Sequence, residues 1–362
     1  MSHWATYFGF DFVGDLGYGS SFEMLDKEEY RWIPPTLMSG SKFLYYVGYL
    51  PFAALVRPFL GSSLQNYIGG QEAADSLKYT LVANQRLADR MALEKKMRGS
   101  GDSRQDSRKD TFYYLLNSKD LVTGKAFTTE ELQADSALII AAGSDGVALT
   151  ISATIFYLLR NPSALSRLIS TIRSAFTSAS EIQNPILSSL SYLTACIDET
   201  LRLCLPKASS LPREVLTGGI TIDNDHFPCG TTLGTLGTPI YVLHHDSTIY
   251  PDPWSYCPER WIPDPKAGVS PESVAAARAA FCPFLIGPMN CIGKNMAYMA
   301  VKFAIAHMLF RYDVRQAEQE TGGGGKVDHP EEGRRRVDEY QMRDYILGFR
   351  DGPVVQLRDM MG

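Results

Sequence analysis

Residues 281–297 carry the residue types and the spacing most suited to chemistry. The stretch reads Phe-Cys-Pro-Phe-Leu-Ile-Gly-Pro-Met-Asn-Cys-Ile-Gly-Lys-Asn-Met-Ala. Four of its residues have the spacing F-x-x-G-x-x-x-C-x-G: Phe284, Gly287, Cys291 and Gly293. Apolar residues recur at helical spacing over 297–308, which predicts a buried helix that begins just after Cys291.

A cysteine in a loop before a helix faces free backbone N–H groups and the positive end of the helix dipole. Both favour the thiolate, which can ligate a metal axially while N–H bonds tune the sulfur. Gly287 and Gly293 would let the backbone lie close to a flat cofactor, and Phe284 would shield the sulfur from water. The alternative is a tight turn that carries an inert, buried cysteine.

The loop resembles the haem-binding loop of the cytochrome P450 family of haem-thiolate monooxygenases. Three further stretches match the family in its order, at residues 142–145 (Ala-Gly-Ser-Asp), 199–202 (Glu-Thr-Leu-Arg) and 257–261 (Cys-Pro-Glu-Arg-Trp). The resemblance extends from about Phe10 to the C-terminus and is similar to fungal members of the microsomal type. It implies a mainly α fold with small β-sheets, here as a single domain over residues 1–362. In the family a membrane anchor, the first helices and part of one sheet precede this stretch, so we expect an N-terminally truncated fold.

The resemblance also implies haem b, with Cys291 as the axial ligand of its iron. The expected cofactor-binding residues are Phe284, Gly287, Cys291, Gly293, Arg213 and Ala142. Arg213 is expected to pair with a haem propionate. The family's other basic propionate partner, two residues before the cysteine, is Met289 here, so we expect weaker haem binding than is usual in the family.

A capping-box pattern at Thr128 and Glu131 opens a helix of about thirty residues, which ends before Asn161. Its Ala142-Gly143 pair should present a face without bulk to a flat cofactor. The catalytic residues implied by the resemblance are Ser144, Asp145 and Gly146. Asp145 would serve proton delivery or a bend in the helix.

Gly146 and Val147 stand where the family usually has hydroxyl residues, so the usual proton relay is in doubt. Ser144, Thr150, a substrate group or ordered water could replace it.

Glu199 and Arg202 lie one helical turn apart, so their side chains can meet. In the family they form a buried ion triad with the arginine of the third stretch, here Arg260. Such a network fixes geometry more than it adds stability. The alternative is a solvated surface pair. His244 and His245 lack a ligand pattern, and we interpret them as structural. We also expect a last β-hairpin through residues 345–349 and 353–355.

Composition limits the classes of partner. The 362 residues include 45% hydrophobic and 21% charged residues, as in an ordinary globular protein. The net charge of −5 argues against nucleic-acid binding. Six cysteines without a C-x-x-C pair, together with the lack of a secretory signal, indicate reduced thiols in a cytosol-facing protein.

The longest apolar run, Phe43 to Val56, is interrupted by Pro51 and is too short to span a membrane. We therefore expect no transmembrane segment. The run is either a buried pair of short helices or a peripheral membrane contact, which would place the protein at the endoplasmic reticulum surface.

Three functions are compatible with these patterns. The first is a monooxygenase that receives electrons from NADPH-cytochrome P450 reductase and oxidises a small lipophilic substrate, as in fungal secondary metabolism. Lys294 and Arg260 are expected to attract the reductase. The second is a haem-thiolate enzyme that uses peroxide or isomerises its substrate. The third is a truncated, non-catalytic remnant or an incomplete gene model.

Overall fold

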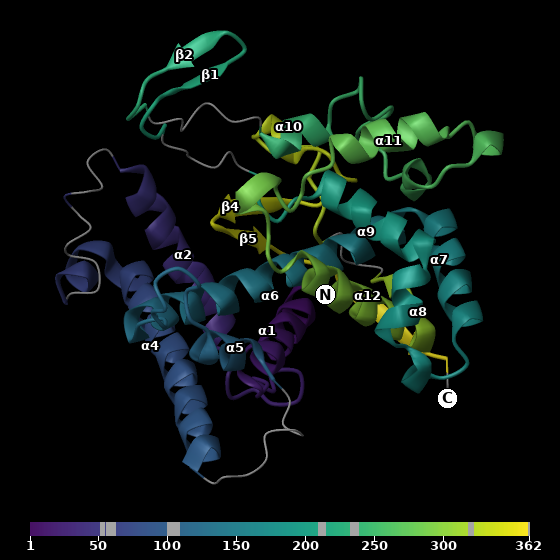
Figure 1. Cartoon of the computed structure of the whole chain (residues 1–362). Helices are drawn as coiled ribbons and strands as arrows, with labels where there is room; N and C mark the ends of the chain where they lie inside the picture. Colours follow the sequence, from purple (N-terminus) through teal and green to yellow (C-terminus); the bar gives the residue numbers. More distant parts are fainter. Residues whose placement is uncertain are drawn as a thin grey trace. The chain divides into compact units, whose positions relative to one another are not determined.

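The computed structural model describes residues 1–50, 55, 63–99, 109–208, 215–231, 239–317 and 322–360, and it divides into two compact units. The first unit comprises Met1–Ser152 and Tyr345–Val354, and the second comprises Ala153–Asp344 and Val355–Gly362. Most described residues are helical and the sheets are small, which confirms the predicted fold class (Figure 1). The prediction of a single domain stays a prediction.

The first unit is built from helices and one strand: α1 (Ser2–Tyr18), α2 (Ile33–Tyr49), α4 (Ser63–Gly99), α5 (Thr111–Asn117), most of α6 (Thr129–Arg160) and β5 (Leu347–Arg350). Helices α2 and α4 pack closely along each other. Gly40 permits this approach because it has no Cβ, which would lie 2.6 Å from the Cα of Ser76. The core includes Phe10, Tyr18, Phe22, Met24, Phe112, Leu132, Ile140 and Leu347.

Helix α6 begins as its sequence predicts. The N–H of Thr128 donates to the Glu131 carboxylate at 2.7 Å, and the N–H of Glu131 donates to the Thr128 hydroxyl at 3.2 Å. By length and composition α6 could span a membrane, although the sequence led us to expect no transmembrane segment. However, 67% of its apolar window is buried inside the structure, as in the core helix of a globular protein.

The second unit contains α7 (Pro162–Ala175), α8 (Asn184–Ser189), α9 (Ser191–Leu203), α10 (Ile240–His244), α11 (Pro271–Ala279) and α12 (Lys294–Arg311). Most of β4 (Met342–Tyr345) also belongs to it. It also has two antiparallel pairs, β1 (Ile220–Ile222) with β2 (Asp225–Phe227) and β3 (Tyr312–Gln316) with β6 (Val355–Asp359). The predicted hairpin over 345–349 and 353–355 is wrong, because β6 pairs with β3, with Val314 opposite Leu357. Strand β6 therefore pairs with β3, which is distant from it in the sequence, and does not form a hairpin with the segment just before it.

Candidate functional site

The loop around Cys291 is fixed by its own backbone. The N–H of Cys291 donates to the carbonyl of Phe284 at 2.8 Å, and the carbonyl of Cys291 accepts from Lys294, the first residue of α12, at 3.3 Å. Gly287 has φ 75°, a left-handed conformation that favours glycine. The predicted order of a tight loop, a cysteine and a helix is therefore present.

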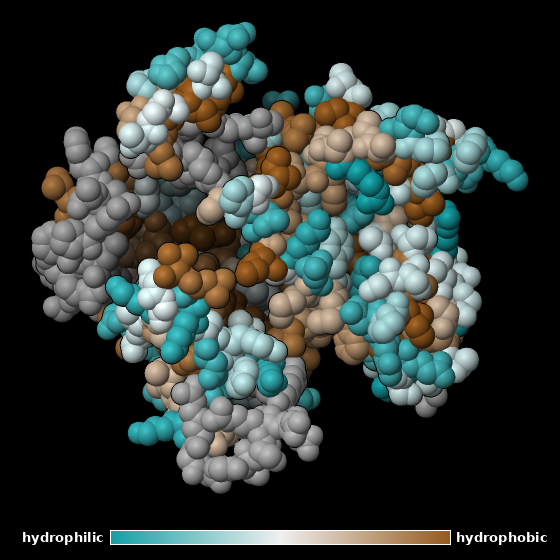
Figure 2. All heavy atoms as spheres, viewed as in Figure 1, coloured by the Kyte–Doolittle hydropathy of each residue, from teal (hydrophilic) through white to brown (hydrophobic). Residues whose placement is uncertain are grey.

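Cys291 is exposed, and apolar side chains surround it in the sequence. Hydrophobic residues are exposed elsewhere on the molecule as well (Figure 2), but here four fall within eleven positions. They are Ile286 (79%), Met289 (70%), Ile292 (104%) and Met296 (41%). An exposed thiol among apolar side chains fits a flat, largely apolar group bound through the sulfur. Among the described residues no three histidine, cysteine or acidic side chains gather in a way that could hold a metal ion.

Cys282, the other cysteine of this stretch, has a different environment. It is half-buried, burial raises the pKa of its thiol, and its N–H donates to Nε2 of His244 at 3.1 Å. Cys291 is the more exposed of the two thiols.

Helix α12 contacts the Cys291 loop through Tyr298. The ring of Tyr298 lies 5.4 Å from that of Phe284, and its hydroxyl donates to the carboxylate of Asp198 on α9 at 2.6 Å. Asp198 is 2% exposed, and burial raises the pKa of its carboxyl group to about 6. Asp198 therefore contacts Tyr298, and Tyr298 contacts Phe284 in the Cys291 loop.

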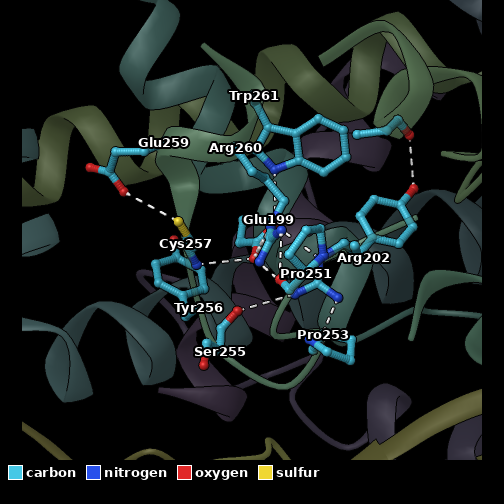
Figure 3. A network of polar contacts seen from close by, with 12 residues as sticks. Glu199, Arg202, Pro251, Pro253, Ser255, Tyr256, Cys257, Glu259, Arg260 and Trp261 are labelled. Atoms are coloured by element: carbon cyan, nitrogen blue, oxygen red, sulfur yellow. Dashed lines mark hydrogen bonds and ion pairs between the residues drawn. The ribbon is translucent and has the colours of Figure 1, made fainter. Parts of the chain in front are cut away.

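Glu199, the neighbour of Asp198, is the centre of the predicted ion triad (Figure 3). Its carboxylate accepts from Arg202 at 2.8 and 3.0 Å and from Nε of Arg260 at 3.0 Å. The side chains of Glu199 and Arg202 are 0% exposed and that of Arg260 is 11% exposed. The structure thus brings the three residues together in the interior, and a solvated surface pair is excluded.

Backbone groups and the indole of Trp261 complete this network. Glu199 also accepts from the N–H of Cys257 at 3.0 Å and from Nε1 of Trp261 at 2.9 Å. Arg202 donates to the carbonyls of His244, Pro253 and Ser255 at 2.7–3.2 Å. No role was predicted for Trp261, although it ends the third matching stretch. The triad therefore ties α9 to the chain that follows α10.

In the first unit, Ser144, Asp145 and Gly146 lie on α6. Ala142 is exposed and Gly146 is half-buried. The hydroxyl of Ser144 donates to the carbonyl of Ile140 at 2.7 Å, and that of Thr150 donates to the carbonyl of Gly146 at 2.7 Å. Both hydroxyls offered as a substitute proton relay are therefore engaged by the helix backbone.

The expectation that Gly143 presents a bare face is wrong. A Cβ at this position would lie 2.6 Å from a methyl group of Val13, so α1 covers the glycine. Gly143 serves the close approach of α1 to α6. Ala142 remains the exposed residue of the pair.

Asp145 is engaged by the strand β5. Its carboxylate accepts from the N–H of Gly348 at 2.9 Å and from Arg350 at 2.6 Å. Arg350 was not foreseen, since nothing in a sequence links residues this far apart. Arg213, expected to hold a propionate, lies outside the described residues.

Comparison with known proteins shows which protein family this chain resembles. The family model described as cytochrome P450 matches residues 1–322. The cytochrome P450 monooxygenase fscF of Fusarium equiseti is 34% identical over 360 residues, covering 99% of this chain and 66% of that protein. The cytochrome P450 monooxygenase apf8 of Gibberella fujikuroi is 33% identical over 357 residues, covering 98% of this chain and 90% of that protein.

Among solved structures, the crystal structure of the haem domain of cytochrome P450DA has a TM-score of 0.70 at 16% identity and covers 98% of this chain and 67% of that one. The match shows a shared fold. The chain spans about two thirds of the length of several of these proteins, namely 66% of fscF and 64% of the monooxygenase apf7 of Gibberella fujikuroi.

Proposed function

The chain belongs to the cytochrome P450 family, and we propose that it is a haem-thiolate monooxygenase that inserts one oxygen atom from dioxygen into a lipophilic substrate. The observation that carries this proposal is the exposed Cys291 in its apolar loop before α12. Family and fold imply haem with an axial cysteine thiolate.

When bound, haem supplies the iron that activates dioxygen. The chain's own residues hold and shield it. Cys291 would ligate the iron, Phe284 would keep water from the sulfur, and the backbone at Gly287 and Gly293 would pass close to the ring. Ala142 stays an expected cofactor-binding residue by family resemblance alone.

The electrons would come from NADPH through a flavoprotein reductase. Lys294 is exposed at the start of α12 and supports docking of an acidic partner on this face. Arg260 is held by Glu199 and its side chain is 11% exposed, so it offers a partner less surface than Lys294.

An apolar cavity in the first unit supports a lipophilic substrate. It measures about 220 Å³ and is lined from α2, α4, α6 and β5, with Leu37, Leu44, Leu138, Ala141, Ile346 and Leu347 among its apolar residues. Hydroxyls at its edge are bound to backbone carbonyls: Ser41 to Met38, Tyr79 to Ala137 and Thr80 to Ser76. An apolar cavity of about 150 Å³ in another protein binds benzene. This cavity is therefore sized for a ring with a short alkyl group, as in a terpenoid or polyketide of fungal secondary metabolism.

The end of α2 supports a peripheral membrane contact at the endoplasmic reticulum surface. Its exposed residues include Leu44, Tyr46, Tyr49 and Leu50, at 45–59%. Tyrosine and leucine together suit the interface between lipid head groups and acyl chains. The rest of the predicted membrane-contact run, residues 51–54 and 56, lies outside the described residues.

The test of the proposed activity is ligation. Haem-loaded protein, reduced and treated with carbon monoxide, should show the red-shifted Soret band of a thiolate-bound iron. Cys291→Ala should abolish the band, and Cys282→Ala is the matched control that should keep it. A band that survives in Cys291→Ala and is lost in Cys282→Ala would reverse the assignment.

One observation favours a second candidate, a haem-thiolate enzyme that uses peroxide. Between Ala142 and Thr150 the side-chain hydroxyls of Ser144 and Thr150 both donate to helix carbonyls, and Gly146 has none to give. Gly146→Thr should raise the product formed per NADPH consumed and lower the peroxide released. High coupling in the wild type that falls in Gly146→Thr would instead mean that the glycine makes room for substrate.

A further inference from the structure

Asp145 and Arg350 form a buried pair within the first unit. Nη1 of Arg350 lies 2.6 Å from the Asp145 carboxylate, and the two side chains are 4% and 11% exposed, respectively. The same nitrogen donates to the carbonyl of Gly348 at 2.7 Å, while the N–H of Gly348 donates to Asp145 at 2.9 Å. Nη2 of Arg350 reaches the hydroxyl of Thr6 on α1 at 3.3 Å. Both backbone polar groups of Gly348 are therefore held by this pair.

The turn just before Gly348 is strained. Ile346 has φ 72°, a left-handed conformation that a β-branched residue rarely adopts. Such a conformation persists where the surrounding contacts impose it, and it is common at ligand-binding sites. On its other side the turn is packed by aromatic rings, since the ring of Tyr345 lies 5.3 Å from that of Tyr45 on α2 and 5.2 Å from that of Phe349.

The strained turn is also a wall of the apolar cavity. Ile346 lines it from the turn before β5, Leu347 from the start of β5, and Ala137, Leu138 and Ala141 from α6. Asp145 follows Ala141 by one helical turn, so α6 lines the cavity and also carries the carboxylate that holds the turn. The position of the turn relative to α6 therefore depends on the bonds of Asp145.

We propose that Asp145 and Arg350 are positioning residues that hold the Tyr345–Gly348 turn against α6 and so determine the size of the apolar group that the cavity accepts. The proposal rests on the proposed function, in which this cavity receives part of the substrate. It gives the carboxylate of Asp145 a role in substrate fit, whereas a proton relay would require that carboxylate to exchange protons with water.

The two roles predict different relations between variants. If the pair positions the turn, Arg350→Gln and Asp145→Asn should change ligand preference in the same way, and the double variant should add little to either, because both break one contact. If Asp145 relays protons, Asp145→Asn alone should increase peroxide release and the solvent isotope effect on turnover, and Arg350→Gln should not.

The experiment is calorimetric titration of the haem-loaded protein with n-alkylbenzenes from toluene to hexylbenzene. The wild type should bind one chain length best. Arg350→Gln and Asp145→Asn should bind that ligand about tenfold more weakly and should shift the preference to longer chains, because one misfitting methylene in an apolar pocket has an effect of this order. Arg350→Lys keeps the charge without the fork of donors and should fall between wild type and Arg350→Gln.

The matched control is Arg90→Gln. Arg90 also forms a buried pair in the first unit, with Asp110 at 2.7 Å, but neither residue lines the cavity. This variant should lower stability and leave the chain-length preference unchanged. If the wild type binds alkylbenzenes and Arg350→Gln keeps the same chain-length preference, the positioning role is wrong, whereas the cavity is still supported as the substrate site. If the wild type binds none of them, the proposed substrate cavity fails, and the positioning role fails with it.

Discussion

Glu199→Gln should be the most damaging conservative change in the second unit. It removes the charge that faces Arg202, whose side chain is 0% exposed, and it leaves one oxygen where Glu199 now accepts from Arg202, Arg260, Cys257 and Trp261. Breaking a buried pair by removing one partner costs about 3–5 kcal/mol, because the remaining charge is buried without compensation. Since folded proteins are stable by about 5–15 kcal/mol, this is a large part of the total.

Urea unfolding of the apoprotein, followed by the fluorescence of tryptophans such as the buried Trp261, measures the effect. With a slope of about 3 kcal/mol per M, a loss of 3–5 kcal/mol lowers the midpoint by more than about 1 M. The control is Glu259→Gln. Glu259 pairs with Arg167 at 3.1 Å, but the two side chains are 39% and 53% exposed, respectively, so its loss should cost less than about 1 kcal/mol. Equal midpoints for Glu199→Gln and wild type would refute the reasoning, because the desolvated arginine would then have found another partner at no cost.

Two further predictions concern the cofactor and pH. Haem loading of the chain should be substoichiometric, and Met289→Arg should strengthen binding by about 1.5–3 kcal/mol, the value of one charge-assisted hydrogen bond, as measured by haem titration; complete loading of the unchanged protein would contradict this. Burial lowers the pKa of His244 to about 4, whereas its pKa in the unfolded chain is about 6.5. The stability that comes from keeping this imidazole neutral is therefore complete above pH 6.5 and is lost as pH falls through 4. The free energy of unfolding falls by about 3 kcal/mol over this range. His244→Gln, whose side-chain carbonyl can still accept the Cys282 N–H, should reduce the fall in unfolding midpoint between pH 7 and pH 4; an unchanged slope would assign the effect to other groups. The raised pKa of Asp198 acts in the opposite direction, since burial favours its protonated form and the stability this gives is lost as pH rises through about 6.

Local patterns predicted the local parts of the site. The capping box of α6, the start of α12 and the Glu199–Arg202 pair each depend on residues within one or two helical turns, and the structure has all of these contacts. The sequence could not reveal which neighbour covers a helix face, so the contact of Val13 with Gly143 was missed. It also could not show that Arg350 bonds to Asp145, since 205 residues separate them and no periodic pattern spans that distance.

The contact of Arg350 with Asp145 also bears on the order in which the molecule can be completed during its synthesis. Thr6, Asp145 and Arg350 meet within one unit, although the first and the last of them are 344 positions apart in the sequence. A chain grows on the ribosome at about 5–20 residues per second, so helices α1 to α6 exist for tens of seconds before β5 leaves the ribosome. Throughout that time the Asp145 carboxylate and the apolar faces that Leu347 later covers have no partner from β5. Both units therefore wait for the end of the chain, the first for residues 345–354 and the second for β6, which pairs with β3.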